Sequence, residues 1–76
     1  MNNKRRDLLR LAISSLEQAS EYISRALDQE QDCLDNMPEN LQCSERYERM
    51  EDVISHLEES IENIDEAKNS VEEAIA

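Results

Sequence analysis

The 76-residue sequence contains no glycine, no tryptophan and no phenylalanine, and only one histidine. Without glycine it can form neither a phosphate-binding glycine loop nor an EF-hand calcium loop, because both need glycine at a tight turn. The histidine, His56, follows Val53 at three residues, so the Glu-x-x-His motif of di-iron helical bundles is missing as well. The sequence therefore predicts no catalytic residue, no metal site and no cofactor, and we expect a protein that is not an enzyme.

Long apolar runs and positive charge are also scarce. No apolar stretch is long enough to span a membrane, and no apolar core with a cleavage site follows the basic start, so we expect a cytoplasmic protein. The net charge is −11, and the first ten residues carry +3, which leaves −14 for the remainder. Such a surface repels nucleic acid and anionic lipid. We therefore predict no direct DNA binding, no membrane association and a preference for basic partners.

Apolar residues recur with a seven-residue period in both halves of the chain, which is typical of helices that pack side by side. From Met50 the sequence divides into the units MEDVISH, LEESIEN, IDEAKNS and VEEAIA. The predicted seam of the second half is Cys43, Tyr47, Met50, Ile54, Leu57, Ile61, Ile64, Lys68, Val71 and Ile75. The predicted seam of the first half is Leu9, Ala12, Leu16, Ala19, Ile23, Ala26 and Cys33, with Glu30 as its polar interruption.

The only proline, Pro38, separates the two runs. Because proline and the residue before it resist helical conformation, the first helix has to end near residue 36. We predict helices over about residues 3–35 and 44–75, joined by a connection over about 36–43 in which Leu41 packs on the end of the core and Ser44 is the helix N-cap. A connection this short makes the helices antiparallel. The predicted fold is all-α: residues 1–76 form a single coiled-coil-like, antiparallel two-helix hairpin.

A further apolar column lies beside each seam, although a two-helix hairpin covers only one stripe per helix. Because a chain of this length also has a small core, we predict that two hairpins dimerise into a four-helix bundle. A monomer with a partly wet flank is the alternative. The candidate self-association residues are Leu8, Ile13, Tyr22, Leu27, Leu34, Val53, Ala67 and Ala74.

The antiparallel arrangement carries two further expectations. Lys4 and Arg5, in an unfavourable position at the start of a helix, would lie beside Glu72 and Glu73 at the end of the other helix. The two cysteines would face each other near the connection. We expect two buried, reduced thiols there, and a disulfide is the alternative.

Paired acids recur one heptad apart in the second helix and form what we call the acidic stripe: Glu51, Asp52, Glu58, Glu59, Asp65, Glu66, Glu72 and Glu73. The stripe either keeps a small bundle soluble or imitates nucleic-acid phosphates and binds a basic groove on another protein. A second candidate contact patch is Arg46, Tyr47 and Arg49, since Tyr and Arg are favoured at interfaces. Alternatively, the two arginines form local ion pairs with glutamates.

The connection resembles a known pattern. The segment Asp35-Asn36-Met37-Pro38-Glu39-Asn40-Leu41-Gln42, followed by Ser44-Glu45-Arg46, Glu48 and Met50-Glu51, is similar to a motif in small, mostly uncharacterised helical proteins of bacteriophages and prophages. That motif reads D-N-L-P-E-S/N-L-Q-x-S-E-R-x-E-x-M-E and precedes acidic heptads. The resemblance covers about residues 30–76, and Cys43 and Tyr47 occupy variable positions. It implies an accessory gene product that acts in the bacterial cytoplasm, and it implies no particular activity.

Three functions of different classes follow. The first is a non-enzymatic anti-defence protein that inhibits a host immune protein by binding its basic surface. The second is an oligomeric sponge for a nucleotide signal, which needs cationic pockets between subunits built from Arg5, Arg6, Arg10, Arg46 or Arg49. The third is a structural or assembly protein made of helical bundles. The sequence favours them in that order.

Overall fold

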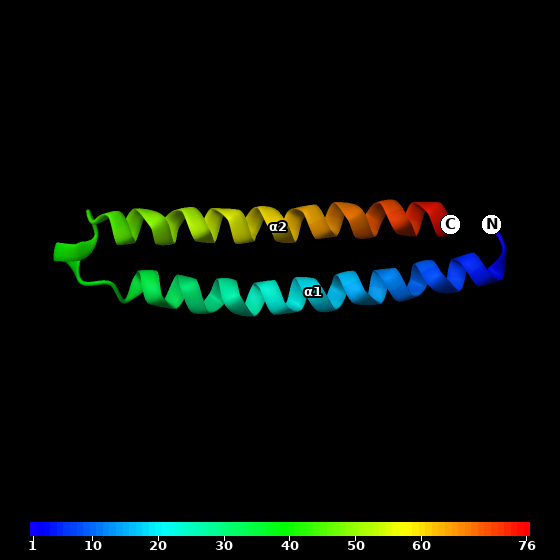
Figure 1. The fold of residues 1–76 in the computed structure, drawn as a ribbon, viewed down its shortest axis with the longest axis horizontal. Coiled ribbons are helices and arrows are strands. Elements are labelled where there is room, and N and C mark those ends of the chain that lie inside the picture. Colours follow the sequence, from blue (N-terminus) through cyan, green and yellow to red (C-terminus); the bar gives the residue numbers. More distant parts are fainter.

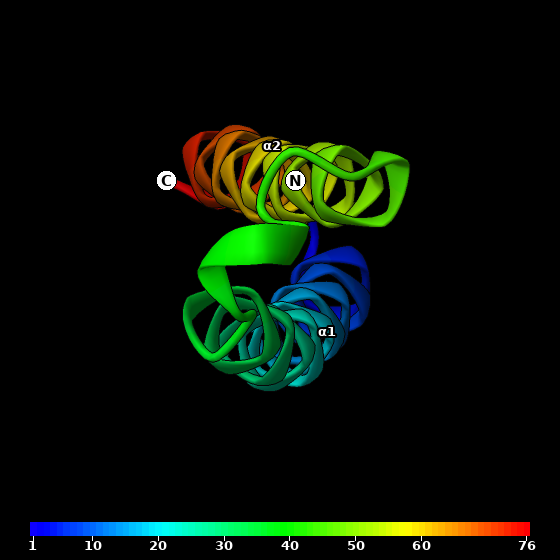
Figure 2. The same ribbon diagram turned by 90° about the vertical axis from the view of Figure 1, so that its left-hand side faces the viewer.

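A computed structural model describes all 76 residues. Helix α1 spans Asn3–Asp35, a single 3-10 turn η1 spans Glu39–Leu41, and helix α2 spans Glu45–Ile75. The two helices lie side by side and run in opposite directions (Figure 1). Seen end-on, they form one layer with no third element over either side (Figure 2). The predicted all-α antiparallel hairpin is confirmed.

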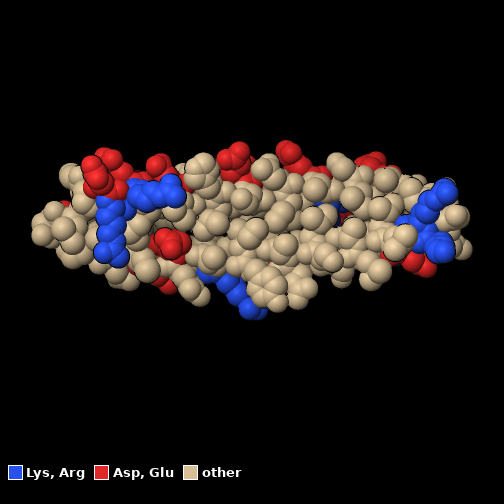
Figure 3. Space-filling view, in the orientation of Figure 1, with Lys and Arg blue, Asp and Glu red and all other residues tan.

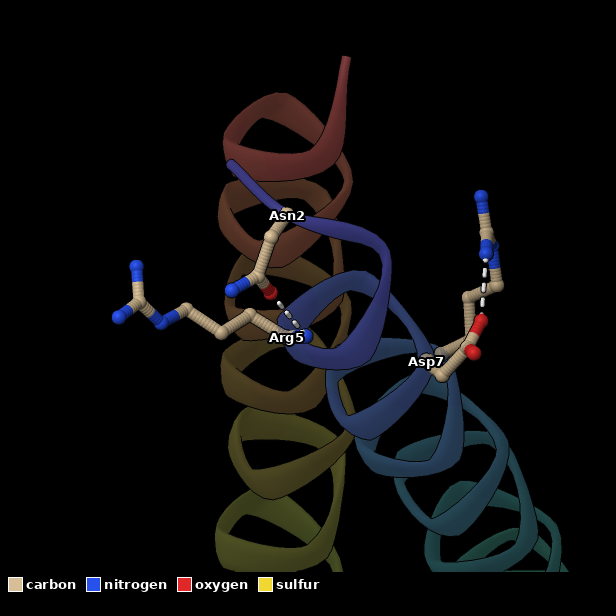
Figure 4. A network of polar contacts seen from close by, with 4 residues as sticks. Asn2, Arg5 and Asp7 are labelled. Carbon is tan, nitrogen blue, oxygen red and sulfur yellow. Dashed lines mark hydrogen bonds and ion pairs between the residues drawn. The ribbon is translucent and has the colours of Figure 1, made fainter.

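Side chains define both ends of α1. The Oδ1 of Asn2 accepts a hydrogen bond from the Arg5 backbone N–H at 2.9 Å and caps the N-terminus (Figure 4). At the other end, both the backbone N–H and the side-chain amide of Asn36 donate to the Asp32 carbonyl, at 3.1 and 2.8 Å. The helix stops there because Pro38 disfavours helical geometry at the residue before it and has no N–H to continue the ladder.

Ser44 is the N-cap of α2, as predicted. Its Oγ accepts a hydrogen bond from the Tyr47 N–H at 3.2 Å and donates one to the Leu41 carbonyl at 2.6 Å. Because Ser44 is the cap, α2 begins at Glu45, one residue later than predicted. Leu41 is 44% exposed, so the prediction that it packs on the core end is wrong. Met37 is half-buried instead.

The seam of α2 follows the predicted heptads. Ile54 is the one buried residue of the chain, with 6% of its surface exposed. Cys43 is exposed and lies outside the seam, because α2 starts after it. The other predicted seam residues are all half-buried: Tyr47, Met50, Leu57, Ile61, Ile64, Lys68, Val71 and Ile75.

The seam of α1 differs from the predicted one in the C-terminal half of the helix, whereas Ala12 and Ala19 are half-buried as predicted. Ala26 and Cys33 are exposed, which contradicts their predicted place in the seam. The column one residue further along takes their place, because its leucines and isoleucine bury more apolar area against α2 than alanines do. The observed half-buried seam is Leu9, Ile13, Leu16, Ser20, Ile23, Leu27, Glu30 and Leu34, and Arg6, Ala12, Ala19, Ser24 and Gln31 are half-buried beside it.

The hairpin is an elongated rod that covers little of its own surface. Its principal extents are 60 × 15 × 13 Å. The solvent-accessible area is 5839 Å², whereas a folded protein of 8.8 kDa exposes about 4,800 Å² on average. Roughly 1,000 Å² more surface is exposed than expected, because each helix covers one stripe of the other and nothing covers the outer sides.

Candidate interaction surfaces

The acidic stripe is exposed over its whole length. None of its carboxylates forms an ion pair. The three ion pairs of the chain are Arg10–Asp7 at 2.9 Å, Arg25–Glu21 at 2.6 Å and Lys68–Glu17 at 3.8 Å. Every charge of the stripe is therefore directed to solvent and available to a partner.

Charge is divided between the two flanks of the α2 seam. Each heptad contributes two residues to the seam, such as Ile54 and Leu57. The residue directly before the first of them and the residue directly after the second lie on opposite flanks of the seam. Glu51, Glu58, Asp65 and Glu72 share one flank. Val53, Ser60, Ala67 and Ala74 share the other, on which the heptads place no acid. The two sides of α2 therefore differ in charge as well as in polarity.

Helix α1 is divided in the same way. Its alanines, Ala12, Ala19 and Ala26, share one flank, and Glu17 lies on the other. Because the Glu17 carboxylate contacts Lys68 at 3.8 Å and the helices are antiparallel, the flank of Glu17 adjoins the acidic flank of α2. The uncharged flanks of both helices therefore meet on the opposite side of the hairpin.

We call this second side the neutral face. Figure 3 shows that it is uncharged over most of its middle, while carboxylates follow the outer edge of α2 and cations lie near both ends; one further cation projects from the lower edge, over α1, and one acidic group lies on the face towards the connection. Glu30 is half-buried in the α1 seam. The neutral face comprises Leu8, Ala12, Ala19, Tyr22 and Ala26 of α1 and Val53, Ser60, Ala67 and Ala74 of α2.

Large apolar side chains are exposed on α1. Leu8 is 61% exposed, Leu11 66% and Tyr22 58%. The Tyr22 ring accepts a hydrogen bond at its Oη from Gln18 Nε2 at 3.3 Å, and the Arg25 guanidinium lies 5.9 Å from its centroid. Exposed apolar groups of this size, two of which lie on the neutral face, indicate contact with another molecule.

The predicted self-association residues fall into two groups. Leu8, Tyr22, Ala67 and Ala74 are exposed. Ile13, Leu27, Leu34 and Val53 are half-buried, and the first three belong to the seam within the hairpin rather than to its flank. Five of the eight predicted residues lie on the neutral face: Leu8, Tyr22, Val53, Ala67 and Ala74. The face also contains Ser60 and the α1 alanines, which the predicted seam had placed inside the hairpin.

Five of the eight cations have no ionic partner within the chain, and all five lie near the ends of the hairpin: Lys4, Arg5, Arg6, Arg46 and Arg49. The predicted pairing of the first α1 turn with Glu72 and Glu73 is wrong. This turn extends past the end of α2 (Figure 1), and none of its cations forms an ion pair with Glu72 or Glu73. The local glutamate pairs proposed for Arg46 and Arg49 do not form either.

The second candidate contact patch is only partly accessible. Arg46 and Arg49 are exposed, whereas Tyr47 is half-buried in the seam. Cys33 and Cys43 are free and exposed, so the prediction of two buried thiols is wrong. Cys33 lies beside the α1 seam, in the same column as Ala12, Ala19 and Ala26, because the seam passes through Leu34 instead.

The rod has no pocket, and no three His, Cys, Asp or Glu side chains are grouped so that they could hold a metal ion. Neither helix has a segment that is long and apolar enough to cross a membrane. No family model, curated protein or solved structure matches this chain. The candidate sites are therefore surfaces: the acidic stripe, the neutral face and the basic residues near the ends.

Proposed function

We propose that this protein is a non-enzymatic binding protein of a phage or prophage, which inhibits a bacterial immune protein by covering a basic surface on it in the host cytoplasm. The setting rests on the resemblance of residues 35–51 to phage-encoded helical proteins. The mode of action rests on one observation, the segregation of unpaired carboxylates along one side of a rigid rod.

The acidic stripe has the physical properties that such binding needs. Its four carboxylate pairs repeat every heptad, about 10 Å apart along α2. Because both helices are continuous, the charges are held in a line before a partner arrives, and little ordering entropy is lost on binding. A line of negative charge also accelerates association with a basic groove, in a manner that salt weakens. A groove built for nucleic-acid phosphates is the partner surface that fits best.

The active form in this proposal is a dimer of hairpins that forms a four-helix bundle. The support is the excess exposed area and the exposed Leu8 and Tyr22 on a side that carries no stripe residue. A dimer that covers this side leaves the acidic stripe of both copies free.

Affinity capture from a host lysate tests the proposal. We expect the protein to retain a basic host protein in low salt and to release it as salt is raised. The double variant Glu58→Gln, Asp65→Asn should lose this partner. The matched control is Asp7→Asn, Glu21→Gln, which removes the same charge from carboxylates already paired with arginines.

Three results would contradict the proposal. One is that no host protein is retained, and another is that both double variants retain it equally. The third is a nucleotide released when the purified protein is denatured, which would identify the sponge function instead.

A further inference from the structure

We propose that a second copy of this chain docks on the neutral face, with a two-fold axis perpendicular to the long axis of the hairpin that passes beside Ala19. Helix α1 then packs antiparallel on α1 of the second copy, and α2 on α2. This inference rests on the dimer in the proposed function and specifies its interface, its symmetry and its contact residues.

Charge selects the neutral face for this contact. Each copy carries a net charge of −11, so any face that contains the stripe would bring carboxylates against carboxylates. The heptads place no acid on the flanks that form the neutral face. An axis beside Ala19 overlaps the two α1 helices over all 33 residues, about 50 Å, and the two α2 helices over about 30 Å. Because each helix takes up about half of the 15 Å width, the contact buries roughly 1,200 Å² in total, which is the lower limit of the range of about 1,600 ± 400 Å² for stable complexes.

The alanine spacing on α1 selects an antiparallel contact. Ala12, Ala19 and Ala26 lie seven residues apart and are symmetric about Ala19. When two α1 helices cross an axis beside Ala19, Ala12 of one copy lies against Ala26 of the other, and the two Ala19 residues meet. Small residues in register allow the helix backbones to approach closely, and the larger Leu8 and Tyr22 fill the flanks.

The same axis brings α2 into register. Within the hairpin, the residue numbers of the Glu17–Lys68 contact add up to 85, so Ala19 is about level with residue 66 of α2. An axis at this height lays the uncharged column of Val53, Ser60, Ala67 and Ala74 along the same column of the second copy.

The axis also provides partners for the basic start of α1. Residue numbers on the two α1 helices then add up to 38, so residues 4–6 lie level with residues 32–34 of the second copy. The last α1 turn contains Asp32 and Asp35, has no basic residue and ends in the negative pole of the helix dipole. Three cations without an ionic partner in their own chain are thus placed beside two carboxylates that also lack one.

A two-fold axis along the rod is the competing arrangement. It would stack α1 on α2 of the second copy at the register found within the chain, with residue numbers that add up to about 85. Small residues would also oppose each other there, as for Ala12 with Ala74, so packing allows both arrangements. The basic α1 turn, however, would again extend past its neighbour and stay without carboxylates. Charge therefore favours the perpendicular axis.

Cysteine crosslinking distinguishes the two arrangements. In a background of Cys33→Ala and Cys43→Ala, Ala19→Cys alone should form a disulfide-linked dimer of 17.6 kDa, twice the 8.8 kDa chain, on mild oxidation. Ala12→Cys alone should stay uncrosslinked, because its two copies lie 14 residues, or about 21 Å, apart along the helix. The double variant Ala12→Cys, Ala26→Cys should crosslink. Crosslinking of Ala19→Cys only when Ala67→Cys is also present would overturn the proposal in favour of the axis along the rod.

The mass in solution supplies an independent test. Light scattering should give a mass of 17.6 kDa for the wild type, and a single 8.8 kDa species would overturn the proposal. Ala26→Glu, which places a charge on the neutral face, should raise the dimer dissociation constant at least about tenfold. Ser14→Glu, an exposed control outside the neutral face, should leave it unchanged. If the dimer forms as described but no host protein is captured, this inference stands and the proposed function fails.

Discussion

Replacement of Ile54 by alanine tests the packing of the hairpin most directly. Ile54 is the one buried residue, with 6% of its surface exposed, and it lies in the α2 seam. Isoleucine-to-alanine changes in protein cores cost about 2–5 kcal/mol. The seam is open to solvent along both flanks, so water can fill the space, and we expect a cost near the lower limit, about 2–3 kcal/mol.

This cost is large for a chain of 76 residues, because total stabilities of about 0.05–0.15 kcal/mol per residue predict only 4–11 kcal/mol. Each kcal/mol lowers the melting temperature of such a domain by about 4–8 °C, so we expect a decrease of roughly 10–20 °C. Urea unfolding followed by helical circular dichroism measures the change as a lower midpoint with an unchanged slope. Protein concentration must be held fixed, because a dimer gains stability with concentration.

Ile75→Ala is the matched control, since it removes the same atoms from the last residue of α2, where helices fray. We expect it to cost less than about 1 kcal/mol. If both variants cost the same, the centre of the seam is no better packed than its end, and our account of the hairpin core is refuted.

Two further substitutions test the seam itself. Leu27→Ala should lower the unfolding free energy by about 2 kcal/mol, because Leu27 is half-buried in the seam. The neighbouring Ala26→Gly should lower it by only about 1 kcal/mol, the cost of glycine in a helix. A larger effect at Ala26 would favour the seam predicted from the heptads. Lys68→Leu should raise the unfolding free energy by about 1 kcal/mol, because leucine buries more apolar area in the seam than the lysine stem does. The ion pair that is lost contributes little, since Glu17 is exposed. A lower stability in urea unfolding would show that this ion pair contributes more than its exposure implies.

The heptads specified α2 better than α1 for a physical reason. In α2 the large apolar residues occupy one column, with acids on one flank and mostly small residues on the other, so only one seam buries much area. In α1 two neighbouring columns are apolar. Either of them could form the seam together with Leu9, Leu16 and Ile23. The periodicity alone does not distinguish the alanine column from that of Ile13, Leu27 and Leu34. Buried area decides between them, and it becomes apparent only with α2 in place.

The sequence pattern also does not predict the stagger of the two helices, which is the distance by which α2 is displaced along α1. Pro38 and Ser44 predict where the helices end and begin, but the η1 turn sets how far α2 is displaced along α1. With that displacement the basic α1 start extends past the end of α2, where Glu72 and Glu73 lie (Figure 1). The acidic stripe was predictable because it depends only on positions within α2.

The interior of this molecule is a row of small side-chain layers along the rod rather than one globular core. Each layer consists of a few side chains of α1 and those level with them on α2, and it contacts only the two neighbouring layers. The free energy of unfolding is then roughly a sum over layers, as in other quasi-one-dimensional proteins. Insertion or deletion of seven residues in both helices at the same height would change the length of the rod and keep the heptad register of every remaining layer. The length of this hairpin can therefore change in steps of seven residues per helix with no rearrangement of the remaining packing.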